Sequence, residues 1–311
     1  MTSGWRLAGI AAAAGFCMVT LPMLAPGSND DETKPNGKGI GTLFNPGNGN
    51  GGAKSAGRGK PGGNIISYHG GPLILGTVNV YYIWYGDWAG NPATTILTDF
   101  ITNIGGSPYY NINTTYHNGS NVPLSNSVFL AGSTYTPSTA HGKSLSDTDI
   151  RTIVMDAING HQLPLDNNAV YFVLTSADVT ATSGFCTKYC GWHTYGTITG
   201  LTTRIKYAFV GDPTRCPSSC MEQSIGPNGA SGADGMASVI AHELEEAASD
   251  PELNAWYDGS GAENADKCAW TFGSTYPAAN GALANIKLGA RDYLIQQNWV
   301  NSGNGFCAQS H

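Results

Sequence analysis

Hydrophobic and polar residues follow two different periods along this chain, and both kinds of regular structure are predicted. Runs rich in β-branched and aromatic residues predict strands at 78–85, 170–174 and 205–210. Apolar residues at helical spacing predict helices at 94–104, 145–160 and about 233–248. Residues 286–299 alternate like one long strand or the arm of a hairpin. Strands and helices that alternate in this way predict a mixed sheet with flanking helices, in an α/β (α+β) fold.

The two ends of the predicted fold have different compositions. Residues 1–25 combine one positive charge with an apolar, Ala-rich run, which is typical of a secretory signal peptide. A membrane anchor is the competing interpretation, but the run is short and Pro22 interrupts it. Residues 26–64 are Gly, Asn, Lys and Pro with few apolar residues, so we expect a disordered linker there. Residues 65–311 then form one domain.

Composition and cysteine content narrow the class of protein. Only 12% of the residues are charged and 42 are Gly, which suits a loop-rich extracellular protein. The net charge of −7 argues against nucleic acid as a partner. Of seven cysteines, Cys17 falls in the predicted signal peptide, and the other six imply three disulfides. Six cysteines allow fifteen pairings, of which we favour Cys186–Cys190, Cys216–Cys220 and Cys268–Cys307 over zinc ligation by four thiolates.

The third predicted helix carries the candidate chemistry. Its sequence from Ala241 reads Ala-His-Glu-Leu-Glu-Glu, which is the metalloprotease pattern H-E-x-x-H with Glu246 in place of the second histidine. His242 and Glu246 lie one turn apart on one helix face, so both can reach a single ion. Glu243 stands where a metalloprotease has its general base. Asp250, on the same face, precedes Pro251, which ends the helix.

A second acidic cluster follows in the sequence and supplies candidates for a third ligand. Peptidases of the gluzincin type take this ligand about twenty residues beyond the helix, which here is Glu263, while a metzincin-like spacing gives Glu252. We favour Glu263, with Asp250 and Asp266 as neighbouring candidates. The donor set predicts Zn²⁺, with Mn²⁺ or Ca²⁺ as alternatives. The alternative is that these carboxylates are solvated surface residues without an ion.

Two further side chains are candidates for stabilising an oxyanion. His193 follows the Cys-rich segment, and Tyr257 lies between the helix and the acidic cluster. A buried structural role is the alternative for His193. No Gly-x-Ser-x-Gly sequence is present, so a serine nucleophile is not supported.

Several segments from Tyr68 onward resemble one family. They are Tyr-His-Gly-Gly-Pro-Leu at 68–73, Tyr-Tyr-Ile-Trp-Tyr-Gly-Asp-Trp at 81–88, Gly-Phe-Cys at 184–186 with Cys-Gly at 190–191, and Phe-Val-Gly at 209–211 before Cys216 and Cys220. This pattern resembles the phosphate-induced protein 1 (EXORDIUM-like) family. The resemblance implies a secreted, cell-wall-associated protein linked to growth, without an established enzymatic activity. The His-Glu core of the helix departs from the plant pattern and resembles microbial relatives, while the order of elements is similar to that of zincin peptidases.

Two hypotheses follow. The first is a secreted, monomeric, metal-dependent hydrolase, a zincin-like peptidase that acts on protein or cell-wall material. In it His242, Glu246 and Glu263 hold the ion and Glu243 takes a proton from water. The second is a non-catalytic extracellular protein of EXORDIUM type with a structural ion or none. In it Trp84, Trp88 and Trp192 are candidates for contact with polysaccharide, with packing in the core as the alternative and commoner role.

Overall fold

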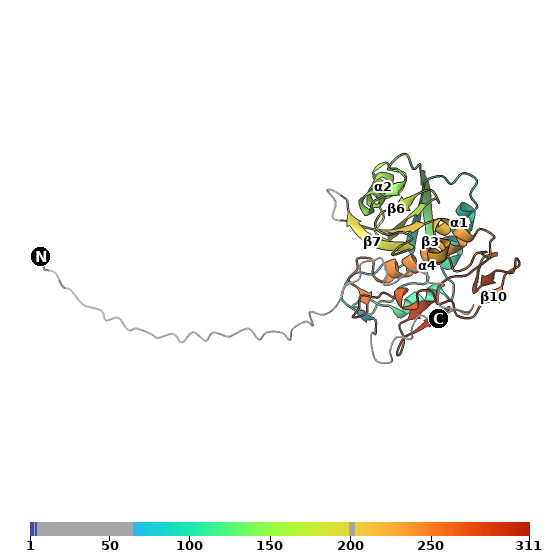
Figure 1. The fold of residues 1–311 in the computed structure, drawn as a ribbon. Coiled ribbons are helices and arrows are strands. Elements are labelled where there is room, and N and C mark those ends of the chain that lie inside the picture. The colour runs from blue at the N-terminus through green and yellow to red at the C-terminus, as the bar shows by residue number, and fades with distance from the viewer. Residues whose placement is uncertain (3, 5–64, 199–202) are drawn as a thin grey trace. The chain divides into compact units, whose positions relative to one another are not determined.

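A computed structural model describes residues 1, 2, 4, 65–198 and 203–311 (Figure 1). The predicted signal peptide at 1–25 and linker at 26–64 therefore lie outside the described residues, apart from residues 1, 2 and 4. Everything below concerns the part of the chain from residue 65 onward.

A five-stranded sheet forms the centre of this part of the chain. Its strands lie in the order β3 (Val128–Thr136), β2 (Val78–Tyr85), β5 (Ala169–Thr175), β8 (Arg204–Gly211) and β7 (Gly191–Thr197). The first four are parallel, and β7 pairs with β8 in the antiparallel direction at one edge. Every residue of β5 is buried, as expected of a central strand that is covered on both faces.

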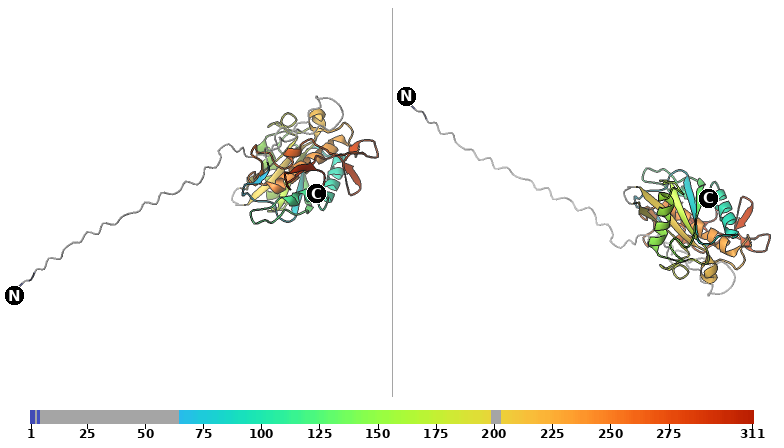
Figure 2. Two further views of the ribbon diagram at one scale, coloured as in Figure 1. Left: turned by 90° about the horizontal axis from the view of Figure 1, so that it is seen from below. Right: turned by 90° about the horizontal axis from the view of Figure 1, so that it is seen from above.

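Helices cover both faces of the sheet (Figure 2). Helices α1 (Ala93–Ile104) and α4 (Ser231–Ser249) pack against each other on one face, and α2 (Asp147–Asn159) lies on the other. Ser146 caps α2: its hydroxyl accepts the Asp149 backbone N–H, and the Asp149 carboxylate accepts the Ser146 backbone N–H. The predicted helices and the strands β2, β5 and β8 are confirmed to within two residues at each end.

Helix α4 is enclosed along almost its whole length. Every residue after Ser231 is buried, although the helix carries one histidine and four carboxylates. A helix buried on all sides is normally apolar, so the polar groups of α4 need partners inside the protein. The helix ends at Ser249, and Asp250 leaves helical geometry with φ of −142° before Pro251.

Short elements surround this core. Two-stranded pairs are β1 (Ser67–Tyr68) with β9 (Trp256–Tyr257), β4 (Ser144–Leu145) with β6 (Thr180–Ala181), β10 (Tyr276–Pro277) with β11 (Leu283–Ala284), β12 (Ile286–Leu288) with β13 (Arg291–Tyr293), and β14 (Asn298–Val300) with β15 (Phe306–Ala308). Short helices are η1 (Tyr110–Thr115), η2 (Pro213–Arg215), α3 (Pro217–Cys220) and η3 (Asp266–Cys268). Residues 286–299 are therefore a tight hairpin followed by a third strand, not one long strand.

Three disulfides join the six cysteines predicted to pair, but two of the predicted pairings are wrong. The bonds are Cys186–Cys216, Cys190–Cys220 and Cys268–Cys307, so only the last agrees with the prediction. Cys216 precedes α3 and Cys220 is its last residue, so the two lie one helical turn apart and face the same neighbour, the segment that carries Cys186 and Cys190. The bonds therefore run between the two segments and not within each one.

Among the described helices, none combines the length and the apolar content that crossing a bilayer requires.

Candidate metal site

Helix α4 provides the first pair of candidate ligands. His242 and Glu246 are one turn apart, and the Nε2 atom of His242 lies 3.1 Å from Oε1 of Glu246. The Nδ1 atom of His242 faces Oε1 of Gln296 at 3.4 Å, and this same oxygen accepts the Trp270 backbone N–H. A histidine that is held through Nδ1 presents Nε2 to a metal, which is the usual arrangement behind a metal-bound imidazole.

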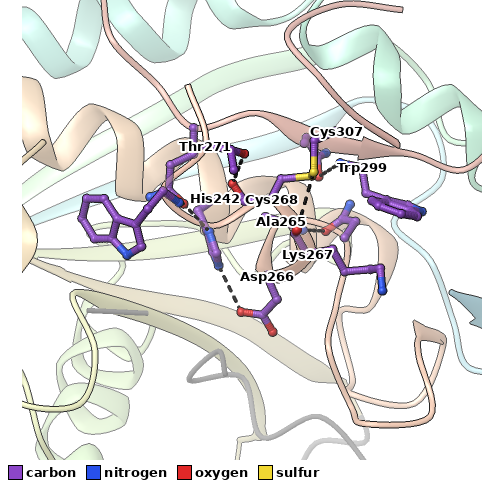
Figure 3. Close-up of a disulfide and its surroundings, with 12 residues drawn as sticks. His242, Ala265, Asp266, Lys267, Cys268, Thr271, Trp299 and Cys307 are labelled. Carbon is purple, nitrogen blue, oxygen red and sulfur yellow. Dashed lines mark hydrogen bonds and ion pairs between the residues drawn. A yellow bond between two sulfur atoms is a disulfide. The ribbon is translucent and has the colours of Figure 1, made fainter. Parts of the chain in front are cut away.

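The acidic loop after α4 brings Asp266 to the same pair. Its backbone N–H donates to Oε1 of Glu246 at 3.0 Å, and its Oδ1 lies 3.6 Å from Nε2 of His242. Asp266 begins helix η3, which ends at Cys268, and the disulfide to Cys307 ties this turn to β15 (Figure 3). The position of the carboxylate therefore depends on a covalent link formed far along the chain.

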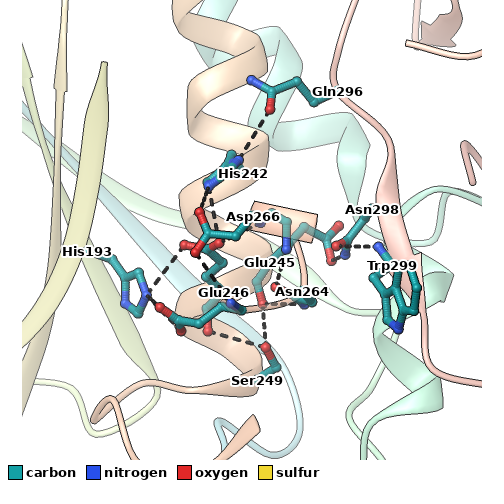
Figure 4. Close-up of polar contacts among 12 residues, drawn as sticks. His193, His242, Glu245, Glu246, Ser249, Asn264, Asp266, Gln296, Asn298 and Trp299 are labelled. Carbon is teal, nitrogen blue, oxygen red and sulfur yellow. Dashed lines mark hydrogen bonds and ion pairs between the residues drawn. The ribbon is translucent and has the colours of Figure 1, made fainter. Parts of the chain in front are cut away.

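The edge strand β7 and the same loop supply a second group. Nε2 of His193 lies 3.2 Å from Oε1 of Glu263 and 3.7 Å from Oε2 of Glu246 (Figure 4). Side chains alternate along a strand, so His193 points toward α4 while its neighbour Trp192 stacks on Phe209.

These side chains form two trios that share one carboxylate. His242, Glu246 and Asp266 form the first trio, and His193, Glu246 and Glu263 form the second. Within each trio, one ligand atom per residue lies within 4.8 Å of the others. His242 is nearest to one oxygen of Glu246, and His193 is nearest to the other.

Burial leaves some of these groups without protein partners. The side chains of both trios are between 0% and 5% exposed. Oε2 of Glu246 and Oε2 of Glu243 are buried and lack a hydrogen-bond partner. A buried carboxylate oxygen without a partner is costly, and a cation is one of the few groups that offsets the cost.

The pKa values of the cluster reflect its burial and the closeness of its carboxylates. Burial, and then the nearby Asp266 carboxylate, raise the pKa of Glu246 to about 7. Burial also raises the pKa of Glu243 and of Glu263 well above the usual range, and neighbouring carboxylates add to the effect. Burial, with a smaller effect from His242, lowers the pKa of His193 to about 3, so this imidazole is neutral and has a lone pair available.

The basic residues nearest in sequence are engaged elsewhere. Lys267 Nζ pairs with Asp258 Oδ2 at 2.8 Å, and Arg291 Nε pairs with Asp99 Oδ2 at 2.6 Å. The basic groups that pair with Glu246 are the imidazoles of His193 and His242.

The structure separates the other acidic candidates from the trios. Asp250 is buried, but its Oδ1 accepts the backbone N–H groups of Asn254 and Ala255, and it belongs to neither trio. It caps the end of α4, so the expectation that it extends the ligand face of the helix is not met. Glu245, adjacent to Glu246, accepts a hydrogen bond from Asn298 Nδ2 at 2.8 Å.

The aromatic candidates also have other environments. The ring of Tyr257 stacks on that of His69 with centroids 3.7 Å apart, and its backbone pairs with Ser67 of β1. Trp84, Trp88 and Trp192 are between 2% and 4% exposed. These rings therefore fill the core, which is the alternative to contact with polysaccharide.

A small pocket adjoins the first trio. His242 and Glu243 line it together with Gly191, Val239 and Gln296, among others. The centre of a water molecule can occupy a volume of about 10 Å³ in this pocket, so the pocket holds about one water.

The chain is similar to a known family and to several plant proteins. The model of the phosphate-induced protein 1 conserved region matches residues 66–297. Protein EXORDIUM-like 5 of Arabidopsis thaliana is 33% identical over 275 residues, covering 75% of each chain. Protein EXORDIUM of Arabidopsis thaliana is 34% identical, covering 70% of this chain and 78% of its own. Protein PHOSPHATE-INDUCED 1 of Nicotiana tabacum is 29% identical, covering 75% and 82%. No solved structure matches.

Proposed function

The chain belongs to the phosphate-induced protein 1 family, and from this premise we propose that it is a non-catalytic extracellular protein of EXORDIUM type with a buried metal site. The metal stabilises the fold by joining α4 to the acidic loop and to β7. The family relationship supports an extracellular cell-wall or signalling role. The three disulfides agree with an oxidising compartment.

The observation that carries this proposal is the enclosure of the candidate ligands. Their side chains are at most 5% exposed, and the adjoining pocket has room for about one water. Sites that bind organic ligands are typically clefts of about 300–1,000 Å³. Within the part of the chain that the structure describes, the pocket beside the cluster is therefore too small for a segment of polypeptide or polysaccharide.

The donor set fits a first-row divalent ion. Imidazole nitrogens combined with carboxylate oxygens suit Zn²⁺, and Mn²⁺ is the nearest alternative. Calcium is disfavoured because it takes six to eight oxygen ligands, whereas each trio includes an imidazole. The Oε2 atom of Glu246, which lacks a hydrogen-bond partner, is a buried acceptor of the kind that such an ion would satisfy.

Metal removal tests the structural role directly. An ion present at about 100 times its dissociation constant stabilises a protein by about 2.7 kcal/mol. For a domain of this size, each kcal/mol corresponds to about 2–4 °C in Tm, so chelation should lower Tm by about 5–11 °C. The measurement is calorimetry of the mature secreted protein before and after dialysis against a chelator, with Zn²⁺ added back.

Adjacent residues of α4 provide matched variants for the same experiment. Glu246→Gln removes the carboxylate that both trios share, and Glu245→Gln changes a buried carboxylate that belongs to neither. The chelator-dependent part of Tm should vanish in Glu246→Gln and persist in Glu245→Gln. A wild-type Tm that does not respond to chelation, in protein without bound metal, would overturn the structural role.

A metal-dependent hydrolase is the second candidate, and the position of Glu243 favours it. This residue lines the pocket beside His242, and its Oε2 lacks a hydrogen-bond partner. A zinc ion held by His242 and Glu246 would lower the pKa of a coordinated water, and Glu243 would then hold the proton that this water loses. Hydrolysis of a peptide library that is lost in Glu243→Gln, with metal content and Tm unchanged, would establish this function in place of the first.

A further inference from the structure

The two trios differ in which oxygen of Glu246 they use. His242 Nε2 and the Asp266 backbone N–H face Oε1, at 3.1 Å and 3.0 Å. His193 Nε2 lies 3.7 Å from Oε2, the atom that lacks a hydrogen-bond partner. A carboxylate approached from both oxygens by separate ligand groups is arranged as a bridge between two centres. Figure 4 shows Glu246 between the two imidazoles.

From this arrangement we infer that the protein binds two divalent metal ions of the zinc class, bridged by Glu246. One ion is held by His242, Glu246 and Asp266, and the other by His193, Glu246 and Glu263. The inference rests on the metal site proposed above and adds the number of ions and the division of ligands between them.

The distances within each trio suit one ion apiece. Ligands that surround zinc at about 2.0–2.2 Å lie about 3–4 Å from one another. His242 Nε2 is 3.1 Å from Glu246 Oε1 and 3.6 Å from Asp266 Oδ1. His193 Nε2 is 3.7 Å from Glu246 Oε2 and 3.2 Å from Glu263 Oε1. In two-metal sites the ions lie about 3.5–4 Å apart, a separation that one bridging carboxylate spans.

The charge of the cluster also favours two ions. Glu243, Glu246, Glu263 and Asp266 influence one another electrostatically, and both histidines lie among them. When all four are ionised, these carboxylates carry the charge that two divalent cations balance, whereas a single divalent cation balances two of them. Glu245 and Asp250 are also buried nearby. One oxygen of each accepts hydrogen bonds, from Asn298 and from backbone N–H groups respectively, and the other oxygen of each lacks a hydrogen-bond partner.

Metal stoichiometry tests the inference. The mature secreted protein is stripped with a chelator and titrated with Zn²⁺ in a calorimeter, and the dialysed product is analysed for metal by mass spectrometry. We expect two ions per chain in the wild type and in Glu245→Gln. Glu263→Gln and Asp266→Asn should each retain one, because each removes a ligand from one trio only. Glu246→Gln should weaken both.

A spectroscopic readout avoids dependence on the folding of the variants. Wild-type protein loaded with Mn²⁺ should give an electron paramagnetic resonance spectrum of a coupled pair, because the two ions share one carboxylate. Circular dichroism of each variant checks that it is folded.

The outcomes separate this inference from the proposed function. One ion per chain, lost equally in Glu263→Gln and Asp266→Asn, would overturn the two-ion inference and leave the metal site intact. No bound ion would overturn both. Two ions with an uncoupled Mn²⁺ spectrum, retained in Glu246→Gln, would overturn the bridging role of Glu246.

Discussion

Replacement of Gly191 by alanine should destabilise the fold and disturb the proposed metal site together. Gly191 is the first residue of β7 and lines the pocket beside His242 and Glu243. A β-carbon there would lie 2.5 Å from Val239 Cγ1, 2.9 Å from the Phe209 carbonyl oxygen and 3.0 Å from Glu243 Oε1. Two of these contacts are with α4, so the methyl group forces the helix and the edge strand apart.

The magnitude follows from the cost of overpacking a core, which is about 1–3 kcal/mol. Gly132 in β3 provides the matched control, because its β-carbon would come no closer than 3.4 Å to Tyr81, an ordinary contact. Gly132→Ala should therefore be neutral or stabilising by up to about 1 kcal/mol, through the lower entropy of the unfolded chain.

Denaturant unfolding of metal-free protein measures both free energies, and an unchanged m-value would show that the comparison is valid. In Gly191→Ala the affinity for Zn²⁺ should also fall, because Glu243 and His242 are on the helix that moves. The reasoning is refuted if Gly191→Ala unfolds within about 0.5 kcal/mol of the wild type, the range typical of surface substitutions.

Three further predictions test the fold around the site. Trypsin cleaves after Lys188 and Arg215. Digestion without reduction should therefore leave the Cys186 peptide and the Cys190 peptide both joined to the peptide that carries Cys216 and Cys220. Mass spectrometry that finds the Cys186 and Cys190 peptides joined only to each other would contradict this pairing. Ser146→Ala removes the capping box of α2 and should cost about 1 kcal/mol in denaturant unfolding, and an unchanged free energy would show that the cap is not needed. Burial raises the pKa of Asp250 from 3.8 to about 7. Below pH 3.8 the Asp250 carboxyl group is protonated in both the folded and the unfolded protein. As the pH rises from about 4 to about 7, the unfolded protein releases this proton and the folded protein retains it, so the free energy of unfolding falls by up to about 4 kcal/mol. The pH profile of unfolding should be flatter in Asp250→Asn across this range, and parallel profiles would refute the raised pKa.

The sequence predicts best those strands whose side chains are buried along their whole length. Strand β2 is buried at nearly every position and β5 at every position, so their sequences are mostly apolar and mark the strands clearly. Strand β3 lies at a sheet edge, and the burial of its side chains is mixed. Strand β7 contains two glycines and only three buried residues. Both edge strands therefore lack the pattern that would have predicted them.

In the candidate site, contacts between residues close in sequence could be predicted, and contacts between distant segments could not. The contact between His242 and Glu246 follows from helical spacing, which a sequence displays directly. The division of the remaining ligands depends on where β7 and the acidic loop lie, and His193 is 70 residues from Glu263 in the chain. Gln296, which faces Nδ1 of His242, has no motif around it that indicates this role. Such partners are visible only in the assembled fold.

Glu246 is the residue at which helix α4 differs from the pattern H-E-x-x-H, and the difference alters the number of ligand atoms that the helix offers. An imidazole there, as in H-E-x-x-H, would offer one nitrogen toward the site and so would serve one ion. A carboxylate offers two oxygens, and here each faces a different histidine. The same residue is fully buried and is fixed by the Asp266 backbone N–H, so it joins α4, β7 and the acidic loop around a common centre. The departure from the protease pattern is therefore consistent with a site that connects three elements of the fold, and enclosure of that site favours stabilisation over turnover.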